Sequence, residues 1–161
     1  MLYLHSIIAD IISDVWGRQV LISIENIQHG KNILKIFYER FDKDRLDKIS
    51  FVHDKSVTRT EDITNFTSCK LKVLIATRIL NQSVTFPELS VLINAAGRKA
   101  FVEVIQRSGR PLGKSATGEK KNVKIYDIVD KHNRYLYRHA IERAKLYEGE
   151  AFPQTGLEKF N

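Results

Sequence analysis

The sequence predicts an α/β protein, a three-layer sandwich with a mostly parallel sheet. Short apolar runs rich in β-branched residues alternate along the chain with amphipathic segments of helical spacing, and this alternation is typical of parallel sheets covered by helices. A length of 161 residues, with 43% apolar and 28% charged residues, indicates one globular domain with a substantial core. We expect that domain to span residues 1–150, followed by a loose tail at 151–161.

Each predicted element follows from its local pattern. Apolar residues recur at helical spacing in five segments, which are Leu4–Val15, Ile27–Phe41, Thr58–Phe66, Lys99–Arg107 and a closing basic helix at about 133–147. Five compact apolar runs are predicted strands, which are Gln19–Ile24, a run from Ile49, Leu71–Ala76, a run from Ser90 and a run from Val123. Thr58, with Glu61 three residues later, has the spacing of a capping box. Ligands of parallel sheets gather beyond the carboxyl ends of strands, so the loops after Ala76, Asn94 and Val129 form the expected binding edge.

The positive charge of the chain is concentrated in its second half. The whole chain has 26 Lys and Arg against 19 Asp and Glu. The segment from Arg98 to Lys145 alone holds 13 basic and 5 acidic residues, a local charge of +8. A concentrated basic segment suits phosphate, either of a nucleic-acid backbone or of a nucleotide. A solvated basic face without a ligand is an equally weighted alternative.

Cysteine and histidine usage points away from disulfides and metals. Cys69 is the single cysteine, so we expect a reducing compartment, the cytoplasm, and no catalytic role for this thiol. The five histidines are scattered without metal-ligand spacing, and no metal site is predicted. Asp10 and Asp14 interrupt the apolar N-terminal segment, and no basic residues precede it. We therefore expect neither a signal peptide nor a membrane span.

The segment Gly109–Ser115, "GRPLGKS", looks at first like a phosphate-binding P-loop. A P-loop needs four residues between its first glycine and the Gly-Lys-Ser/Thr, and it connects a strand to a following helix. Here only three residues separate Gly109 from Gly113, and the segment follows a predicted helix and precedes a predicted strand. The P-loop interpretation fails on both counts. An independent nucleotide kinase or GTPase, which depends on it, is the least supported function.

A reading frame that begins a few residues earlier in this segment gives a better match to a known motif. Gln106–Arg110, "QRSGR", resembles the core of motif VI in the second RecA-like lobe of superfamily-two helicases. Other segments resemble the remaining parts of that lobe in order, namely "RQVLISIENIQHGKNI" for motif IV, "SFVHDKSVTRTEDITNF" for the linking segment, Val73–Ala95 for motif V, and residues 126–152 for the C-terminal helix of the phage UvsW and DNA-repair branch. The resemblance covers about residues 3–152 and implies a RecA-like lobe without its own P-loop. For a phage member of this branch, the expected compartment would be the host cytoplasm.

The resemblance implies a nucleotide role for the motif VI segment. Arg110 matches the arginine that reaches the γ-phosphate, while Arg107 and Gln106 order the cleft and Gly109 permits close backbone approach. Arginine suits this task because its planar guanidinium group forms bidentate hydrogen bonds with phosphate oxygens. The alternatives are a helix-anchoring ion pair for Arg107, a solvated loop arginine for Arg110 and an ordinary helix C-cap for Gly109.

The resemblance also implies contacts with a nucleic-acid backbone. Thr77 matches the motif V threonine, with Arg78 as a weaker candidate beside it, and Ser23 and Asn26 stand at the end of the motif IV strand. Hydroxyls and backbone amides there could bind phosphate, whereas local capping of a turn is the alternative for Thr77. Tyrosines of the closing helix could stack on bases or belong to the core, and these are Tyr135, Tyr137 and Tyr147.

Three positions depart from the family pattern. Gly113 stands where active members usually carry a further arginine, with Lys114 adjacent as a possible substitute that binds the nucleotide. Ser83 replaces a usual glycine of motif V, and Thr85 replaces an aspartate that helps to hold the nucleotide. These departures weaken the expected coupling between the lobes.

The leading prediction is therefore the C-terminal motor lobe of an ATP-dependent helicase or translocase. Its partners would be an N-terminal RecA-like lobe, on the same or a separate chain, and single-stranded or branched nucleic acid, with no membrane. ATP and Mg²⁺ would be held mainly by that other lobe, because nothing in these residues resembles a Walker lysine loop or an acidic Mg²⁺ motif. The isolated chain is predicted to be inactive. The alternative is a degenerate, non-catalytic lobe that binds nucleic acid or protein.

Overall fold

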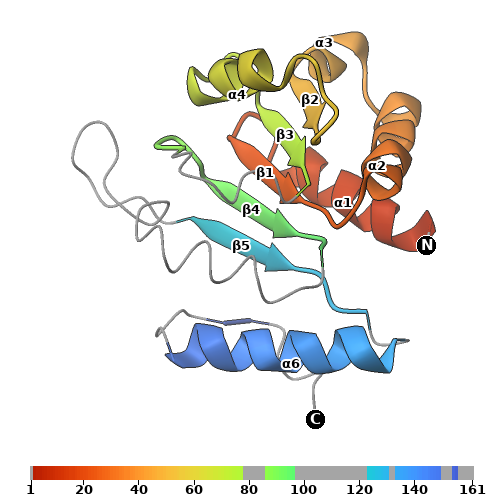
Figure 1. Ribbon diagram of the computed structural model, residues 1–161, viewed down its shortest axis with the longest axis vertical. Coiled ribbons are helices and arrows are strands. Elements are labelled where there is room, and N and C mark those ends of the chain that lie inside the picture. The colour runs from red at the N-terminus through yellow and green to blue at the C-terminus, as the bar shows by residue number, and fades with distance from the viewer. Residues whose placement is uncertain (1, 78–85, 97–122, 131–132, 150–153, 156–161) are drawn as a thin grey trace.

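The structure is a computed structural model, and it describes residues 2–77, 86–96, 123–130, 133–149 and 154–155. Figure 1 shows a sheet with helices packed around it and a long helix, α6, beside its β5 edge. The predicted helix Lys99–Arg107 and most of the predicted tail lie outside the described residues. In the part of the chain that the structure describes, no helix is long and apolar enough to cross a membrane.

The sheet has five strands, all parallel, in the order β2-β3-β1-β4-β5. Their bounds are Val20–Ser23 for β1, Ile49–Val52 for β2, Val73–Ala76 for β3, Val91–Asn94 for β4 and Lys124–Asp127 for β5. Each strand lies within or at a predicted apolar run, and the predicted α/β class is confirmed. Strands β3 and β4, which flank β1, are buried at all four positions. This explains why their sequences are nearly continuous apolar runs rather than alternating ones.

The described helices are α1 (Leu2–Asp14), α2 (Ile27–Arg40), α3 (Lys43–Leu46), α4 (Arg59–Thr67) and α6 (Arg134–Gly149). Four of them match predicted helices. The short helix α3 was not predicted, although Asp42 supplies its N-cap, accepting a hydrogen bond from the Arg45 backbone nitrogen at 2.9 Å. Four residues are too few to show a periodic apolar pattern, so this aspartate was the available signal.

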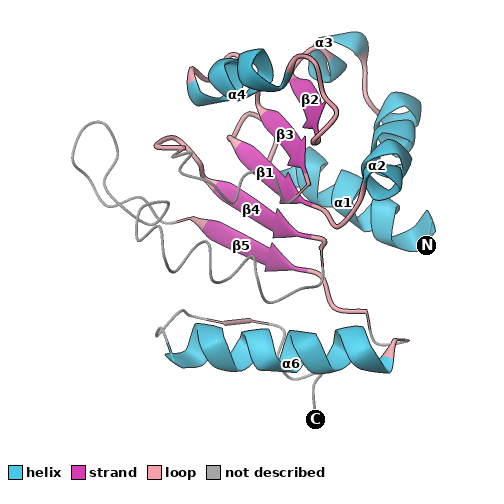
Figure 2. Cartoon of the chain, in the orientation of Figure 1, coloured by secondary structure: helices cyan, strands magenta, loops and turns pink. Residues whose placement is uncertain are grey.

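Alternate side chains of the strands contribute to two cores, one on each face of the sheet. Figure 2 shows the strands in magenta and the helices in cyan that surround them. On the first face, Ile8 of α1 and Phe37 of α2 pack with inward strand residues such as Ile22. On the second face, Phe66 of α4 packs with residues such as Leu74, and its ring meets that of Phe86 edge to face, with centroids 5.0 Å apart. The sheet is therefore the middle layer of the predicted sandwich.

The two ends of α4 differ from the usual pattern. Thr58 is the N-cap residue of α4, as predicted, but the hydrogen bond of a capping box is absent, because Thr58 has φ −86° and ψ 8° and its hydroxyl donates to Asp62 Oδ2 at 2.8 Å instead of accepting from the backbone. At the other end, Cys69 takes a left-handed φ of 63°. Its backbone nitrogen donates to the Phe66 carbonyl at 3.0 Å and that of Lys70 to the Asn65 carbonyl at 2.9 Å, which is a Schellman motif with cysteine where glycine is usual.

Helix α6 is attached to the sheet by a buried ion pair. The Arg143 guanidinium, 1% exposed, donates from Nε to Asp127 Oδ2 at 2.7 Å and from its terminal nitrogen to Oδ1 at 2.8 Å. The Tyr147 hydroxyl donates to Asp127 Oδ2 at 3.1 Å, and Asn94 Nδ2 donates to Oδ1 at 3.4 Å. Since Asn94 and Asp127 are register partners, this network joins the last residues of β4 and β5 to α6.

Candidate nucleic-acid and nucleotide interface

The carboxyl ends of the strands meet at one edge of the sheet, to the right in Figure 1. Ser23, the last residue of β1, is level with Ala76 of β3 and with Asn94 of β4. The chain continues the hydrogen-bonded rows for one more residue, since Ile24 N donates to the Ala76 carbonyl at 3.0 Å and Ala95 N to the Ser23 carbonyl at 2.9 Å. The points at which the chain leaves β3 and β4, where two of the expected binding loops begin, therefore lie at the same edge on either side of β1.

Two predicted contact residues, Ser23 and Thr77, lie on neighbouring strands at this edge. Thr77 follows Ala76, the register partner of Ser23, and both residues are half-buried. The Thr77 backbone nitrogen donates to the Val52 carbonyl at 3.3 Å, so its backbone is fixed by the sheet. Because Thr77 is one residue beyond the register partner of Ser23 and successive side chains of a strand alternate between faces, the two hydroxyls lie at the same rigid edge but towards opposite faces of the sheet, where each suits a separate contact to a phosphate backbone.

Asn26 also lies at this edge, but the structure gives it a local role. It is the N-cap of α2, and its Oδ1 accepts a hydrogen bond from the His29 backbone nitrogen at 2.9 Å. The side chain is exposed. With the oxygen engaged in the cap, a contact to phosphate would come from the amide nitrogen.

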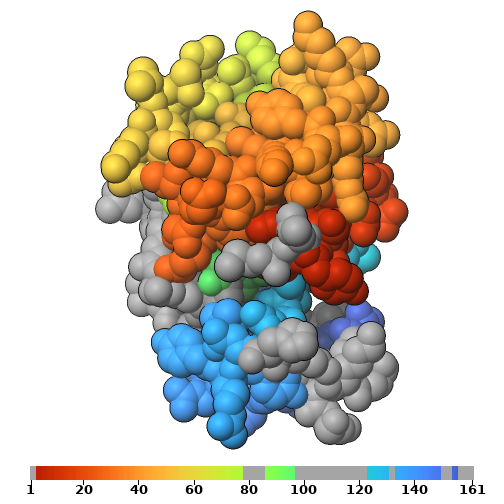
Figure 3. Space-filling view, turned by 90° about the vertical axis from the view of Figure 1, so that its right-hand side faces the viewer, coloured from red at the N-terminus to blue at the C-terminus, as the bar shows by residue number. Residues whose placement is uncertain are grey.

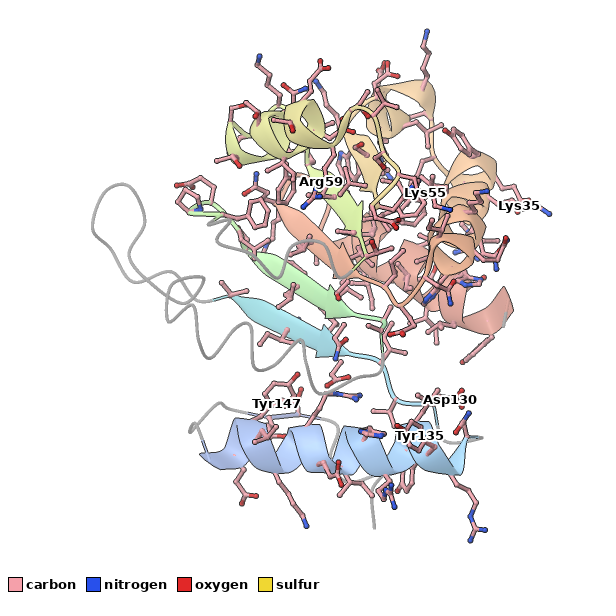
Figure 4. The ribbon with its side chains drawn as sticks, in the orientation of Figure 1. Lys35, Lys55, Arg59, Asp130, Tyr135 and Tyr147 are labelled. Carbon is pink, nitrogen blue, oxygen red and sulfur yellow. The ribbon has the colours of Figure 1, made fainter. Side chains whose placement is uncertain are left out.

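The loop after β2 adds basic residues that the sequence reasoning did not select. Lys55 is exposed in this loop and Arg59 begins α4, as Figure 4 shows. The loop is internally fixed, because His53 N donates to Ser56 Oγ at 2.9 Å and Ser56 N donates to the His53 carbonyl at 3.0 Å. The available signal was a basic strand-to-helix loop at the carboxyl edge, within the segment already matched to the linking motif.

The residues predicted to contact nucleotide lie outside the described residues, and so does one predicted nucleic-acid contact. They are Gln106, Arg107, Gly109, Arg110, Lys114, Thr85 and Arg78. Their roles stay predictions. For those of them that follow β4, the structure does fix the point from which the segment departs, since Ala95 and Ala96 follow Asn94 directly at the carboxyl edge. Asn94 itself is fully buried, and its Oδ1 has no hydrogen-bond partner within the described part of the chain.

The three tyrosines considered for base stacking are separated by burial. Tyr147 is buried, and burial raises the pKa of its phenol, with the Asp127 carboxylate acting in the same direction. Tyr147 is therefore part of the network that holds α6. Tyr137 is half-buried, whereas Tyr135 is 61% exposed, so Tyr135 is the one of the three with an open ring.

Two histidines pack between α1 and α2 near the start of α2. The rings of His5 and His29 are tilted, with centroids 5.2 Å apart. Burial lowers the pKa of His29 from 6.5 to about 4, with a smaller contribution from His5, and burial also lowers the pKa of His5. Both imidazoles are thus neutral near pH 7. Among the described residues no group of three or more His, Cys, Asp or Glu side chains is arranged to hold a metal ion.

The depressed pKa of His29 predicts a pH dependence of stability. Below about pH 6.5 the unfolded chain binds a proton at His29 that the folded chain resists until about pH 4. The free energy of unfolding should therefore fall as the pH drops through that window and should not change on this account above it. Because His29 is only half-buried, we expect its share to be about 1–2 kcal/mol.

Urea unfolding of the wild type and of His29→Gln, at about pH 7.5 and about pH 4.5, measures this share. The Gln variant should lose less stability on acidification than the wild type. His53→Gln, in the exposed loop after β2, serves as the control and should behave like the wild type. Equal acid sensitivity of His29→Gln and the wild type would contradict the assignment.

Comparison with known proteins identifies the family. Residues 4–112 match the protein family described as "Helicase conserved C-terminal domain". The competence protein ComFA of Streptococcus pneumoniae is 34% identical over 93 residues, which are 56% of this chain and 21% of ComFA. The ATP-dependent DNA helicase UvsW of Enterobacteria phage T4 is 25% identical over 149 residues, 81% of this chain and 28% of UvsW. The chain thus spans less than a third of either relative.

Solved structures show the same fold. T4 UvsW superposes with a TM-score of 0.67 at 20% identity, over 94% of this chain and 32% of that one. The Pyrococcus furiosus Hef helicase domain gives 0.62 at 14% identity, over 89% and 27%. Saccharomyces cerevisiae Dbp5 bound to RNA and ADP BeF3 gives 0.59 at 22% identity, over 86% and 35%. The family match, the parallel sheet and the ordered motifs agree, and the chain belongs to the helicase conserved C-terminal domain family, as a RecA-like lobe of the superfamily-two type.

Proposed function

We propose that this chain is the C-terminal motor lobe of an ATP-dependent nucleic-acid helicase or translocase. The observation that carries the proposal is membership of the helicase C-terminal family, supported by the arrangement at the carboxyl edge of the sheet. There Ser23 and Thr77 offer hydroxyls on adjacent strands, and Lys55 adds a cation in the next loop. Nucleic-acid backbone is the ligand that such a set of groups suits.

The second part of the proposal concerns the motif VI segment. Arg110 would reach the γ-phosphate of an ATP held mainly, with its Mg²⁺, by an N-terminal RecA-like lobe, and Arg107 would order the cleft. Phosphoryl transfer is catalysed largely by stabilising charge on the transferred group. An arginine supplied from across a cleft would therefore make hydrolysis depend on the closure of the two lobes.

The test is nucleic-acid-stimulated ATPase of the chain paired with an N-terminal RecA-like lobe. We expect Arg110→Ala to lower kcat about a hundredfold. This is less than the 10³–10⁵-fold contribution of complete arginine fingers, because Thr85 and Gly113 replace the aspartate and arginine of the usual pattern. Arg18→Ala, an exposed arginine before β1 at the opposite edge, is the matched control. Unchanged turnover with Arg110→Ala would remove this residue from the mechanism.

The same departures favour a second candidate function, a degenerate lobe that binds nucleic acid or a protein without hydrolysis. Salt-dependent binding of single strands combined with no ATPase in any lobe pairing would support that alternative. Binding that does not respond to salt would count against phosphate contacts in both proposals, because each phosphate contact releases counterions.

A further inference from the structure

We infer that the amino-terminal half of α6 is a second contact surface for single-stranded nucleic acid. In it, Tyr135 stacks on a base while Arg134 and Arg138 contact the phosphates on either side. This inference rests on the proposed function and extends the path of the strand from the sheet edge onto α6. It concerns residues beyond the family match, which ends at residue 112, and it selects Tyr135 from the three tyrosines of this helix because Tyr135 alone of the three is exposed.

The position of α6 places this surface at the correct edge. Arg143 contacts Asp127, the last residue of β5. Tyr135 lies eight residues earlier in the helix, which is about 12 Å along the axis at 1.5 Å per residue. The chain travels outward from β5 before α6 begins and returns through α6, so the amino half of the helix extends past the strand ends (Figure 4). Figure 3 looks onto that edge and shows α6 exposed on it, below α2.

The Tyr135 ring is both open and supported. It is 61% exposed, and one side rests edge to face against the His139 ring, with centroids 4.3 Å apart. Its backbone is fixed by the helix cap, since Asn133 Oδ1 accepts from the nitrogens of Tyr135 at 3.0 Å and Leu136 at 3.2 Å. A pre-ordered aromatic ring loses little conformational entropy when a base stacks on its free face.

The charge around the ring matches a phosphate backbone. Arg134 and Arg138 are both exposed and are four residues apart, so they lie on the same side of the helix. The stretch 133–141 contains two arginines and no acidic residue. The acidic residues that flank it have local contacts, since Asp130 Oδ1 accepts a hydrogen bond from Asn133 N at 3.3 Å and Glu142 Oε2 lies 3.7 Å from His139 Nδ1. An isolated exposed aromatic residue needs no explanation. An exposed aromatic residue between two exposed arginines has the composition of a single-strand binding surface, in which bases stack and phosphates are neutralised.

The surface is held rigidly relative to the sheet edge. The Arg143 and Tyr147 contacts to Asp127 fix α6 to β5, and the Asn94 contact extends the connection to β4. A strand that leaves Ser23 and Thr77 would therefore meet Tyr135 at a fixed distance, which is the condition for two contact sets to reinforce each other.

The test is fluorescence anisotropy of the full chain with a labelled single strand of about 20 nucleotides, longer than the sites of about 4–16 nucleotides that single binding folds cover. We expect Tyr135→Leu, which keeps bulk and helix propensity but removes the π face, to weaken binding about tenfold. Tyr135→Phe should bind like the wild type. The double variant Arg134→Gln/Arg138→Gln should lower the dependence of log K on log salt by about 1.4, or about 0.7 per phosphate contact.

Two matched controls isolate the surface. Tyr38 is 66% exposed but lies in the last turn of α2, at the amino edge of the sheet, so Tyr38→Leu should not change binding. Lys145 is exposed in the carboxyl half of α6. Tyr135→Leu should therefore weaken binding by the same factor in the Lys145→Gln background as in the wild type. Circular dichroism of each variant checks that α6 remains folded.

The outcomes separate this inference from the proposed function. If Thr77→Val and Lys55→Gln weaken binding but Tyr135→Leu does not, the sheet-edge path stands and the α6 surface is overturned. If Tyr135→Leu weakens the binding of heparin, which has no bases, as much as it weakens the binding of single strands, the surface is a general polyanion site and the stacking role is overturned. If the wild-type chain shows no salt-dependent binding of any single strand, both proposals fail together.

Discussion

Replacing Arg143 by alanine should lower the free energy of unfolding by about 3–5 kcal/mol, which is the usual cost of leaving a buried charge without its partner. The guanidinium is 1% exposed and donates two hydrogen bonds to Asp127 at 2.7 and 2.8 Å. In Arg143→Ala the Asp127 carboxylate keeps, from the described residues, the Tyr147 hydroxyl and the longer Asn94 contact. Helix α6 would then lose its main polar attachment to β5. Urea unfolding followed by circular dichroism measures the change.

Two further variants show whether the loss comes from an unpaired charge. Arg138→Ala removes an exposed arginine from the same helix and should change stability by less than about 0.5 kcal/mol. The double variant Asp127→Asn/Arg143→Met removes both charges and keeps most of the volume, so it should recover a large part of the loss. A loss below about 1 kcal/mol for Arg143→Ala, the range of exposed ion pairs, would show that the pair is solvated.

Replacing Gly30 by valine should lower the free energy of unfolding by about 3 kcal/mol, at the upper end of what overpacking costs. Gly30 is buried in the first turns of α2, and a Cβ built there would collide with the Phe51 ring, lying 2.5 Å from Cε2, and would approach Ile24 Cδ1 to 2.8 Å. The backbone of α2 therefore contacts the sheet at this point. Gly30→Ala should cost less, because the better helix propensity of alanine offsets about 1 kcal/mol.

Lys31→Val is the matched control, since it places the same β-branched residue at an exposed neighbouring position of the same helix. It should cost only the small difference in helix propensity, about 0.5 kcal/mol. Equal unfolding midpoints for the two valine variants would mean that Phe51 and Ile24 move aside without cost. If Gly30→Val is the less stable of the two, we also expect the shift of α2 to displace its N-cap residue Asn26, four residues away at the binding edge.

The fold was largely predictable because its central strands are buried on both faces. The runs "VLIA" and "VLIN" are buried at every position and apolar except for Asn94, and such runs separated by helical segments leave few alternatives to a parallel sheet. Two local features were not predictable with equal ease. Helix α3 is too short for a periodic pattern. The spacing of Thr58 and Glu61 suits a capping box, but Thr58 adopts a non-extended backbone and its hydroxyl bonds to Asp62.

The candidate site likewise has a part that could be predicted from the sequence and a part that could not. Ser23 and Thr77 could be placed at one edge from the sequence, since carboxyl ends of parallel strands share an edge and each residue follows or ends a strand. The pairing of Asp127 with Arg143 could not be derived, because they are 16 residues apart across a loop and a helix. In the sequence Arg143 is one of several arginines in a basic helix, without a pattern that marks it as buried.

The sequence by itself determined the α/β class, the order of the strands along the chain, the residues that stand at their carboxyl ends and the family to which the motifs belong. All of these depend on local periodicity and on residues close together in the chain. Only the tertiary structure decided which side chains of α6 are buried, because burial is set by what packs against each face of the helix. It placed Arg143 and Tyr147 on the β5 carboxylate and left Tyr135 open to solvent, from residue types that look alike in the sequence.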